Sequence, residues 1–194
     1  MESTNIYGEA LAEVLYDHGY TVSIVNPARI KGFAQSELSR TKTDKADAKV
    51  IARFCLALAP APWTPDPQEI RELKALVRRL ESLVEMRQQE VNRLHVAQDI
   101  VVSPLEEHIA YLDQEIKTTK QHIREHIDNH PDLKEKKTLL ESIPGIGEAT
   151  INVVLSEFAN IEKFRNAKQL AAFIGVAPRE RQSGSSVRGR TMMS

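Results

Sequence analysis

Two carboxylates three residues apart, Asp44 and Asp47, form the first group whose types and spacing could support chemistry. Residues at i and i+3 of a helix lie on one face, so both carboxylates could bind one hard cation such as Mg²⁺. The pair is weak by itself, because acids at a helix start are also favoured by the helix dipole. A third acid, Glu2, precedes a helix expected from Ile6. Phosphoryl transfer with two metal ions needs about three or four carboxylates, and three candidates are present.

A second group consists of serine hydroxyls at positions 183, 185 and 186, within an arginine-rich and glycine-rich segment. A serine that attacks a DNA phosphate needs cationic groups to stabilise the transition state and to lower the pKa of its hydroxyl. A flexible tail that only binds phosphate, or a phosphorylation site, would have the same composition, and chemistry alone favours this simpler interpretation. The arginines available for phosphate contacts are Arg179, Arg181, Arg188 and Arg190.

The segment Ile143–Gly147, Ile-Pro-Gly-Ile-Gly, lies between two expected helices and has the pattern of a helix–hairpin–helix element. Gly145 and Gly147 would let the backbone approach a phosphate closely, and the N–H groups of the following helix would point at the anion. Such contacts to a DNA backbone position a protein without reading sequence. A plain tight turn is the alternative.

The formal net charge of −1 argues against a nucleic-acid partner, but the charge is unevenly distributed. Residues 29–53, which include Lys42 and Lys45, carry +4, and residues 163–194 carry +6. Residues 66–142 carry −4. Phosphate responds to local potential rather than to net charge, so the two basic segments are candidate nucleic-acid-binding regions. An ordinary solvated surface is the alternative for either segment.

The composition predicts a mainly α fold with a partial α/β piece. Aromatic residues make up only 5% of the 194 residues, which argues against a β-sandwich. The single cysteine, Cys55, excludes a disulfide framework and a cysteine-based zinc site. Because the chain has no run of 18 apolar residues and no basic-then-apolar leader, we expect neither a membrane span nor a signal peptide.

The first 60 residues read as helix, strand, helix and helix. Apolar spacing predicts a helix over 6–16 that ends at Gly19, and alternation predicts a strand over 21–25. Further helices are expected over 27–35 and 44–59. A single strand cannot form a sheet, so either the first residues complete a second strand or other strands lie outside this sequence.

A stiff proline-rich linker over 60–67 precedes a heptad series of leucines at 73, 76, 80 and 83. Ser103 and Pro104 predict the start of a second long helix, whose apolar residues resume the heptad spacing. An antiparallel hairpin, a kinked rod and dimerisation through the seam all satisfy this pattern. Two more helices are expected, over 149–158 and 167–174.

These motifs, taken in order, resemble the DEDD-type transposases of the insertion-sequence "one-ten" family. The resemblance covers nearly the whole chain and rests on Glu2–Tyr7, Val25–Arg29, Thr41–Ala48, Ile51–Arg53, Ser142–Gly147, Phe164-Arg165, Gln169–Phe173, Gly175–Pro178 and Ser183-Gly184. It implies an incomplete RNase H/RuvC-like nuclease domain over 1–60, a proline linker and coiled-coil arm over 61–138, and a partial C-terminal transposase domain with a helix–hairpin–helix over 139–194.

The resemblance also implies site residues and partners. Glu2, Asp44 and Asp47 match the second, third and fourth acids of the DEDD set, which would bind Mg²⁺, and Ser183 best matches the catalytic serine, with Ser185 and Ser186 as alternatives. The family recombines DNA at element ends and targets, and some members are guided by a structured RNA. The implied protein is bacterial, cytoplasmic, nucleoid-associated and homo-oligomeric through its coiled coil.

The family's first aspartate and its C-terminal Gly-Asn and arginine-rich helices have no match in this sequence. We therefore expect a fragment truncated at both ends that is inactive, or nearly so, by itself. A non-catalytic DNA-binding and dimerisation module, built from the coiled coil and the helix–hairpin–helix, is the alternative function. A pure coiled-coil scaffold would instead bind no nucleic acid.

Overall fold

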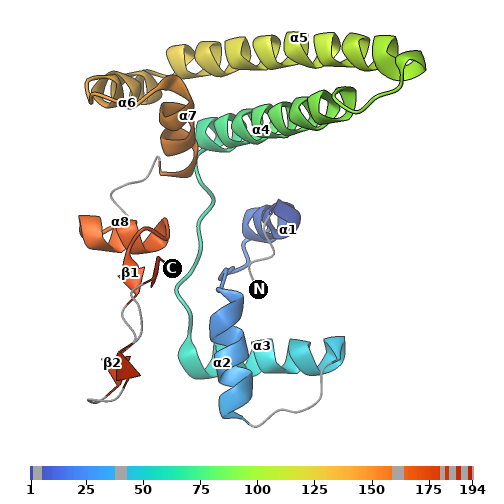
Figure 1. The fold of residues 1–194 in the computed structure, drawn as a ribbon. Helices are drawn as coiled ribbons and strands as arrows, with labels where there is room; N and C mark the ends of the chain where they lie inside the picture. The colour runs from blue at the N-terminus through green and yellow to red at the C-terminus, as the bar shows by residue number, and fades with distance from the viewer. Residues whose placement is uncertain are drawn as a thin grey trace. The chain divides into compact units, whose positions relative to one another are not determined.

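The computed structural model describes residues 1, 6–37, 43–158, 164–179, 182–183, 187–188 and 192–193. This part of the chain is mostly helical, and it divides into two compact units, Met1–Pro67 and Gln68–Ser194 (Figure 1). The prediction of a mainly α fold is confirmed. Among the described residues, none of the helices combines the length and the apolar character needed to cross a bilayer.

The helices of the first unit begin and end where local chemistry satisfies their backbone groups. Helix α1 spans Ile6–Asp17, and Gly19, at a φ of 80°, follows it. The N–H groups of Gly19 and Tyr20 donate to the carbonyls of Tyr16 and Leu15, which is a Schellman motif. The positive φ explains why glycine stands at this position.

The next two helices each have a side-chain cap at the N-terminus. Helix α2 spans Pro27–Ser36, and the Asn26 side chain accepts a hydrogen bond from the Ala28 N–H at 2.8 Å. Helix α3 spans Asp44–Leu58, and the Thr43 hydroxyl accepts from the Ala46 N–H at 3.2 Å. Each cap satisfies one of the N–H groups that a helix start leaves unpaired.

The strand predicted over 21–25 is wrong as a sheet strand, since the described residues show only an isolated bridge at Val25. The segment is extended, and both of its edges are hydrogen-bonded. The Met1 amino group donates to the Ser23 carbonyl at 2.6 Å, and the Val25 N–H donates to the Met1 carbonyl at 3.0 Å. On the other edge the Trp63 N–H donates to the Val22 carbonyl at 2.7 Å. Among the described residues each edge is met at a single residue, Met1 or Trp63, and no ladder is present there.

The core of the first unit is small. Its fully buried centre is Phe54, which is 1% exposed and makes an edge-to-face contact with Phe33 at a centroid distance of 5.5 Å. The guanidinium of Arg29 lies 5.7 Å from the centroid of the Phe54 ring. The buried residues of this cluster are Val25, Ile30, Val50 and Phe54. They join the extended segment to α2 and α3.

The second unit is built on an antiparallel pair of long helices, α4 (Gln68–Leu94) and α5 (Asp99–Asn129) (Figure 1). Of the three arrangements that the heptad pattern allowed, the structure has the hairpin within one chain. Arg87 pairs with Asp113 at one level, and His126 Nε2 lies 2.8 Å from the Glu69 carbonyl oxygen near the other end. These contacts establish the antiparallel direction of the two helices.

The predicted start of the second long helix at Ser103 is wrong. Helix α5 begins at Asp99, and Pro104 lies inside it. Pro104 is the sixth residue of the helix, beyond the first turn, so its missing N–H leaves the Ile100 carbonyl without the usual donor four residues later. The Ser103 hydroxyl does not cap a helix start but donates to the Glu107 carboxylate at 3.3 Å. The predicted first residue of the helix, Pro104, therefore lies five residues after the observed one, Asp99.

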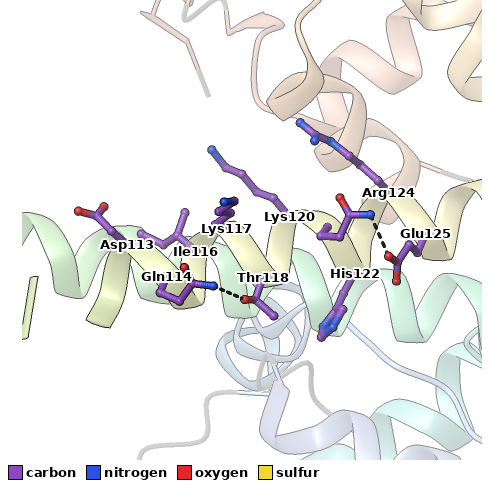
Figure 2. Close-up of a pocket in the computed structure, with 10 residues that line it drawn as sticks. Asp113, Gln114, Ile116, Lys117, Thr118, Lys120, His122, Arg124 and Glu125 are labelled. Atoms are coloured by element: carbon purple, nitrogen blue, oxygen red, sulfur yellow. Dashed lines mark hydrogen bonds between the residues drawn. The ribbon is translucent and has the colours of Figure 1, made fainter. Parts of the chain in front are cut away.

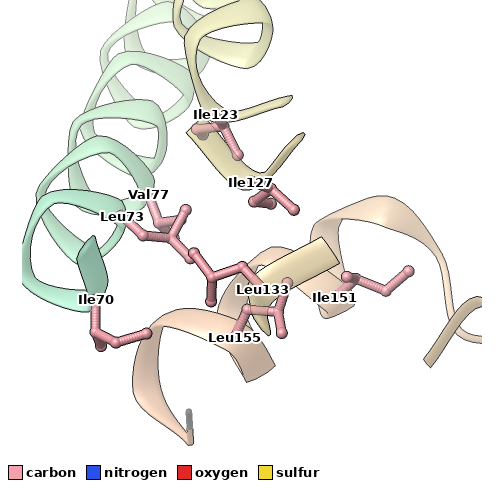
Figure 3. Packing of buried hydrophobic residues seen from close by; sticks show 8 residues of the cluster. All are labelled: Ile70, Leu73, Val77, Ile123, Ile127, Leu133, Ile151 and Leu155. Carbon is pink, nitrogen blue, oxygen red and sulfur yellow. The ribbon is translucent and has the colours of Figure 1, made fainter. Parts of the chain in front are cut away.

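Two shorter helices, α6 (Pro131–Glu141) and α7 (Glu148–Glu157), pack against the open end of the α4–α5 pair. Figure 3 shows the shared core, in which side chains from all four helices converge. Leu73 and Ile123 at its centre have no exposed surface. The buried residues of this core are Ile70, Leu73, Val77, Ile123, Ile127, Leu133, Ile151 and Leu155.

The C-terminal part contains helix α8 (Ala167–Phe173) and four two-residue strands. Strand β1 (Pro178–Arg179) pairs with β4 (Met192–Met193), and β2 (Gln182–Ser183) pairs with β3 (Val187–Arg188), both antiparallel. In α8, Asn166 is the N-cap, and its side chain accepts from the Gln169 N–H at 2.9 Å. The strands were not anticipated, because no alternating apolar pattern marks them.

The shared core makes Leu73 the position most sensitive to truncation. We expect Leu73→Ala to lower the free energy of unfolding of the second unit by about 2–5 kcal/mol, since it removes transfer energy and leaves a cavity. Val84→Ala on the same helix is the control, because the Val84 side chain is 47% exposed. It should change the free energy of unfolding by less than about 0.5 kcal/mol. Urea unfolding followed by circular dichroism measures both, and equal losses would contradict the assigned core.

Candidate functional site

Asp44 and Asp47 lie in the first turn of α3, and both are exposed to solvent. The Thr43 cap sets the helix to begin at Asp44, and the spacing of three places both carboxylates on one side of α3. Neither carboxylate forms an ion pair or a hydrogen bond with another residue in the described part of the chain. Lys45 is exposed in the same turn. The acids are therefore available to a ligand from solvent.

The donor chemistry of this pair fits a divalent cation that prefers oxygen, because two free carboxylates at i and i+3 can share one ion. Within the described ranges, no group of three or more ligating side chains converges. The third predicted acid, Glu2, lies outside those ranges. Its neighbour in sequence, Met1, is hydrogen-bonded through its backbone to Ser23 and Val25.

Ser183 lies in β2, and its main chain is paired with Val187 of β3. The same ladder pairs Gln182 with Arg188, so the backbone of one predicted phosphate-binding arginine runs beside that of the serine. Arg179 lies in β1, which pairs with Met192 and Met193. Several predicted site residues lie outside the described residues: Glu2, Lys42, Arg181, Ser185, Ser186 and Arg190.

The Ile143–Gly147 segment forms a tight turn between α6 and α7. The Ile146 N–H donates to the Ile143 carbonyl at 3.2 Å, and Gly145 has a φ of 90°. Proline at the second position and a positive-φ glycine at the third are the requirements of a type II turn. Ile146 packs against the shared core, whereas Ile143 is 47% exposed. Only Ile146 fills the angle between the two helices.

The start of α7 is open. Gly147 is the N-cap residue and supplies no side chain to cap the first N–H groups of the helix. A Cβ atom built on Gly145 or Gly147 would meet no atom within 4 Å. The glycines therefore leave the backbone accessible rather than relieve a close internal contact, as a turn that approaches an external phosphate would require.

An ion pair that sequence reasoning missed fastens this turn to α5. Arg124 Nε lies 2.5 Å from Glu148 Oε1, and a terminal guanidinium nitrogen lies 2.9 Å from Oε2. The hydrogen bonds from Arg124 are the largest effect and lower the pKa of the Glu148 carboxyl. Burial opposes them as the second-largest effect, and the charges of Arg124, Lys120 and Lys137 each lower the pKa by less. The partners are 24 residues apart, so no local spacing predicts them.

Comparison with known families gives two matches along the chain. Residues 1–103 match a family model described as a transposase, and residues 137–194 match one described as the transposase IS116/IS110/IS902 family. The first match contains Asp44 and Asp47, and the second contains the Ile143–Gly147 turn and Ser183.

Similar curated proteins include the pilin gene-inverting proteins of Moraxella bovis and Moraxella lacunata. Each is 35% identical over 187 residues, which is 96% of this chain and 58% of the relative. The transposase for insertion sequence element IS1328 of Yersinia enterocolitica is 21% identical over 86% of this chain and 56% of its own length. The chain thus spans a little over half the length of these relatives.

The pKa of Glu148 gives the Arg124 pair a defined pH dependence. A carboxyl whose pKa is lowered on folding contributes stability above its unfolded value, about 4.3, and loses that contribution as the pH falls through the lowered value. We expect Glu148→Gln to lower the melting temperature slightly at pH 7, because both side chains of the pair are about half exposed, at 51% and 46%.

The wild-type and Glu148→Gln melting temperatures should converge as the pH falls below 4.3, and thermal unfolding from about pH 7 to 3 measures this. Arg124→Gln, alone and combined with Glu148→Gln, is the matched control in a double-mutant cycle. Additive effects of the two substitutions at pH 7 would contradict the pairing.

Proposed function

The chain belongs to the IS116/IS110/IS902 family of transposases, and from this premise we propose that it cuts and rejoins DNA at an insertion sequence as part of a transposase. The observation that carries the proposal is the exposed, unpaired Asp44 and Asp47 pair at the start of α3, inside the family-matched region. Free carboxylates on one helical face are the donors that metal-dependent phosphodiester chemistry needs.

In this proposal Asp44, Asp47 and Glu2 hold Mg²⁺, which when bound polarises the phosphate and activates the attacking oxygen. The Thr43 cap positions both aspartates by setting where α3 begins. Residues 1–60 would form part of a RuvC-like sheet. The backbone of Met1 supports this reading, because one residue bonded to both Ser23 and Val25 has the pattern of parallel strands.

Ser183 would be the nucleophile, with Ser185 and Ser186 as the alternatives. Its Oγ forms a bond to a backbone phosphorus while one phosphorus–oxygen bond breaks, and the released sugar hydroxyl takes up the proton that the serine gives up. The arginines of the same segment, Arg179, Arg181, Arg188 and Arg190, would offset the charge that develops on the phosphate oxygens. The antiparallel β2–β3 pair supports this placement, since it runs Ser183 and Arg188 in one ladder.

DNA binding by this chain is proposed to use the Gly145–Gly147 turn as a helix–hairpin–helix contact, together with Lys42 and Lys45 beside the acids. The open glycine backbone and the uncapped start of α7 support this role. The long helices would form the coiled-coil arm between residues 61 and 138, through which chains associate. A structured guide RNA and association with the nucleoid are further proposals from the family resemblance.

A second candidate function is inversion of a DNA segment. The relatives that match 96% of this chain at 35% identity are named pilin gene-inverting proteins. The same acids and serine would serve either outcome, since both cut and rejoin phosphodiester bonds. The third candidate is a non-catalytic module that binds DNA and dimerises without metal dependence. Plasmids carrying two recombination sites in direct or inverted orientation distinguish excision from inversion.

Metal binding by the aspartate pair can be measured without activity. We expect Mn²⁺ to broaden amide signals around the start of α3 in NMR spectra, and Asp44→Asn with Asp47→Asn to abolish the broadening because two of the donors are lost. Asp17→Asn, at the C-terminal end of α1, is the matched control and should leave the broadening around α3 unchanged. Equal broadening in the double variant would contradict the assignment.

We expect the 194-residue chain to nick a plasmid carrying element ends weakly or not at all in Mg²⁺, because the resemblance assigns it three of the four acids. Robust nicking that Asp44→Ala abolishes would overturn this expectation while supporting Asp44 as a ligand. Nicking that persists in Asp44→Ala would remove the acid pair from the mechanism.

The nucleophile can be tested in a chimera in which these residues replace the matching part of the Moraxella bovis protein. We expect Ser183→Ala to reduce covalent protein–DNA attachment more than about 1,000-fold, because the hydroxyl forms the bond. Ser185→Ala and Ser186→Ala are the controls and should retain attachment. Denaturing electrophoresis of labelled DNA measures the covalent attachment. Attachment that persists in Ser183→Ala would show that another residue is the nucleophile.

A further inference from the structure

One side of α5 presents a row of cations that no motif of the family resemblance includes. Lys117, Lys120 and Arg124 are spaced by three and four residues, so they lie along one face of the helix over about 10 Å. All three are exposed. In Figure 2 Lys120 and Arg124 extend from the same side of α5, while His122 points to the other side. The three form the α5 basic row.

The carboxylates of α5 leave the two lysines of this row without an ion-pair partner among the described residues. Asp113, one turn before the row, is bound by Arg87 of α4 through two hydrogen bonds. Glu125 accepts a hydrogen bond from the Gln121 amide at 2.8 Å and offers no partner to the lysines. Lys117 and Lys120 therefore carry positive charge that no ion pair among the described residues offsets, whereas Arg124 is paired with Glu148 and residues 66–142 are acidic as a whole.

The surface around these cations is lined mostly by side chains that can donate hydrogen bonds, together with the carboxylates of Asp113 and Glu125. A shallow depression on this side of the helix is bordered by Gln114, Thr118 and Gln121 in addition to the lysines and Arg124. Amides, hydroxyls and cations together are the groups that contact phosphate and sugar oxygens in protein–nucleic acid complexes. A protein partner would more commonly meet a central apolar patch, and Ile116 is the one large aliphatic side chain in the lining.

The α5 basic row is continuous with the Gly145–Gly147 turn. Arg124 binds Glu148, the first residue of α7, and Glu148 follows Gly147 directly. The charges of Lys120 and Lys137 also lower the pKa of the Glu148 carboxyl, by less than the hydrogen bonds from Arg124 do. The cations of α5 and the open backbone of the turn thus lie side by side, joined by a contact within the second unit.

We propose that Lys117, Lys120 and Arg124 bind the phosphodiester backbone of a nucleic-acid strand that also contacts the Gly145–Gly147 turn. The proposal rests on the nucleic-acid binding in the proposed function and extends it onto the long helix. Arg124 has two roles in this arrangement. Its ion pair with Glu148 orients the turn, and its guanidinium is the cation located where α5 meets the start of α7. Lys117 and Lys120 contribute point charges that bind phosphate without reading sequence.

Lys117→Gln with Lys120→Gln tests the row, because glutamine keeps the stem and removes both charges. Binding to duplex DNA and to an RNA hairpin of the same length is measured between about 50 and 200 mM salt. We expect the log–log salt slope to fall by about one unit for each lysine lost, with about tenfold weaker binding at the lowest salt. A loss on DNA, on RNA or on both supports the proposal and identifies the source of the backbone.

Arg79→Gln with Lys134→Gln is the matched control, since it removes two exposed cations from other helices of the second unit. Circular dichroism and thermal unfolding check that both double variants keep the fold. An unchanged salt slope in Lys117→Gln with Lys120→Gln, or an equal fall in the control, would overturn the row as a binding surface. Absence of binding by the wild-type chain to either probe would overturn the proposed nucleic-acid binding and this inference with it.

Discussion

The packing of α4 against α5 is the interaction on which the second unit depends. Leu73 and Ile123 have no exposed surface, and they lie where α6 and α7 also enter the same core. Because most helical stability in proteins comes from packing an amphipathic face, the long helices depend on this shared apolar contact to remain folded. The turn between α6 and α7 is held at that end of the hairpin by Ile146 in the core and by Glu148 on Arg124. Core packing thus decides where an open glycine backbone is presented.

The first unit depends on capping and on a small core rather than on a sheet. The Thr43 hydroxyl and the Asn26 amide set where two helices begin, and Phe54 packs those helices together. The extended segment before α2 is held by two hydrogen bonds to Met1 on one edge and one from Trp63 on the other. This arrangement leaves Asp44 and Asp47 exposed at the start of α3, without internal partners among the described residues.

Electrostatics in this chain is local. A net charge of −1 is compatible with phosphate binding because the acids of the long hairpin are partly occupied by internal partners. Asp113 binds Arg87, Glu148 binds Arg124, and Glu90 lies buried against Arg93. These pairs leave Lys117 and Lys120 exposed on a segment that is acidic overall. The distribution of partners, rather than the sum of charges, therefore decides which surfaces attract an anion.

The sequence by itself determined the helices, their approximate bounds and the family. Thr43 before Asp44, Gly19 after α1 and Pro-Gly at 144–145 act through neighbours in the chain, so local rules predict them. The tertiary structure alone decided that the heptad series pairs within one chain, that residues 21–25 show only single-residue contacts in the described part of the chain, and that Arg124 meets Glu148. Each of these depends on which segments that are far apart in the sequence come together in space, and the spacing of residues along the chain does not predict that. The sequence did not single out the α5 basic row for the same reason, since its proposed role in phosphate binding follows from the Gly145–Gly147 turn beside it.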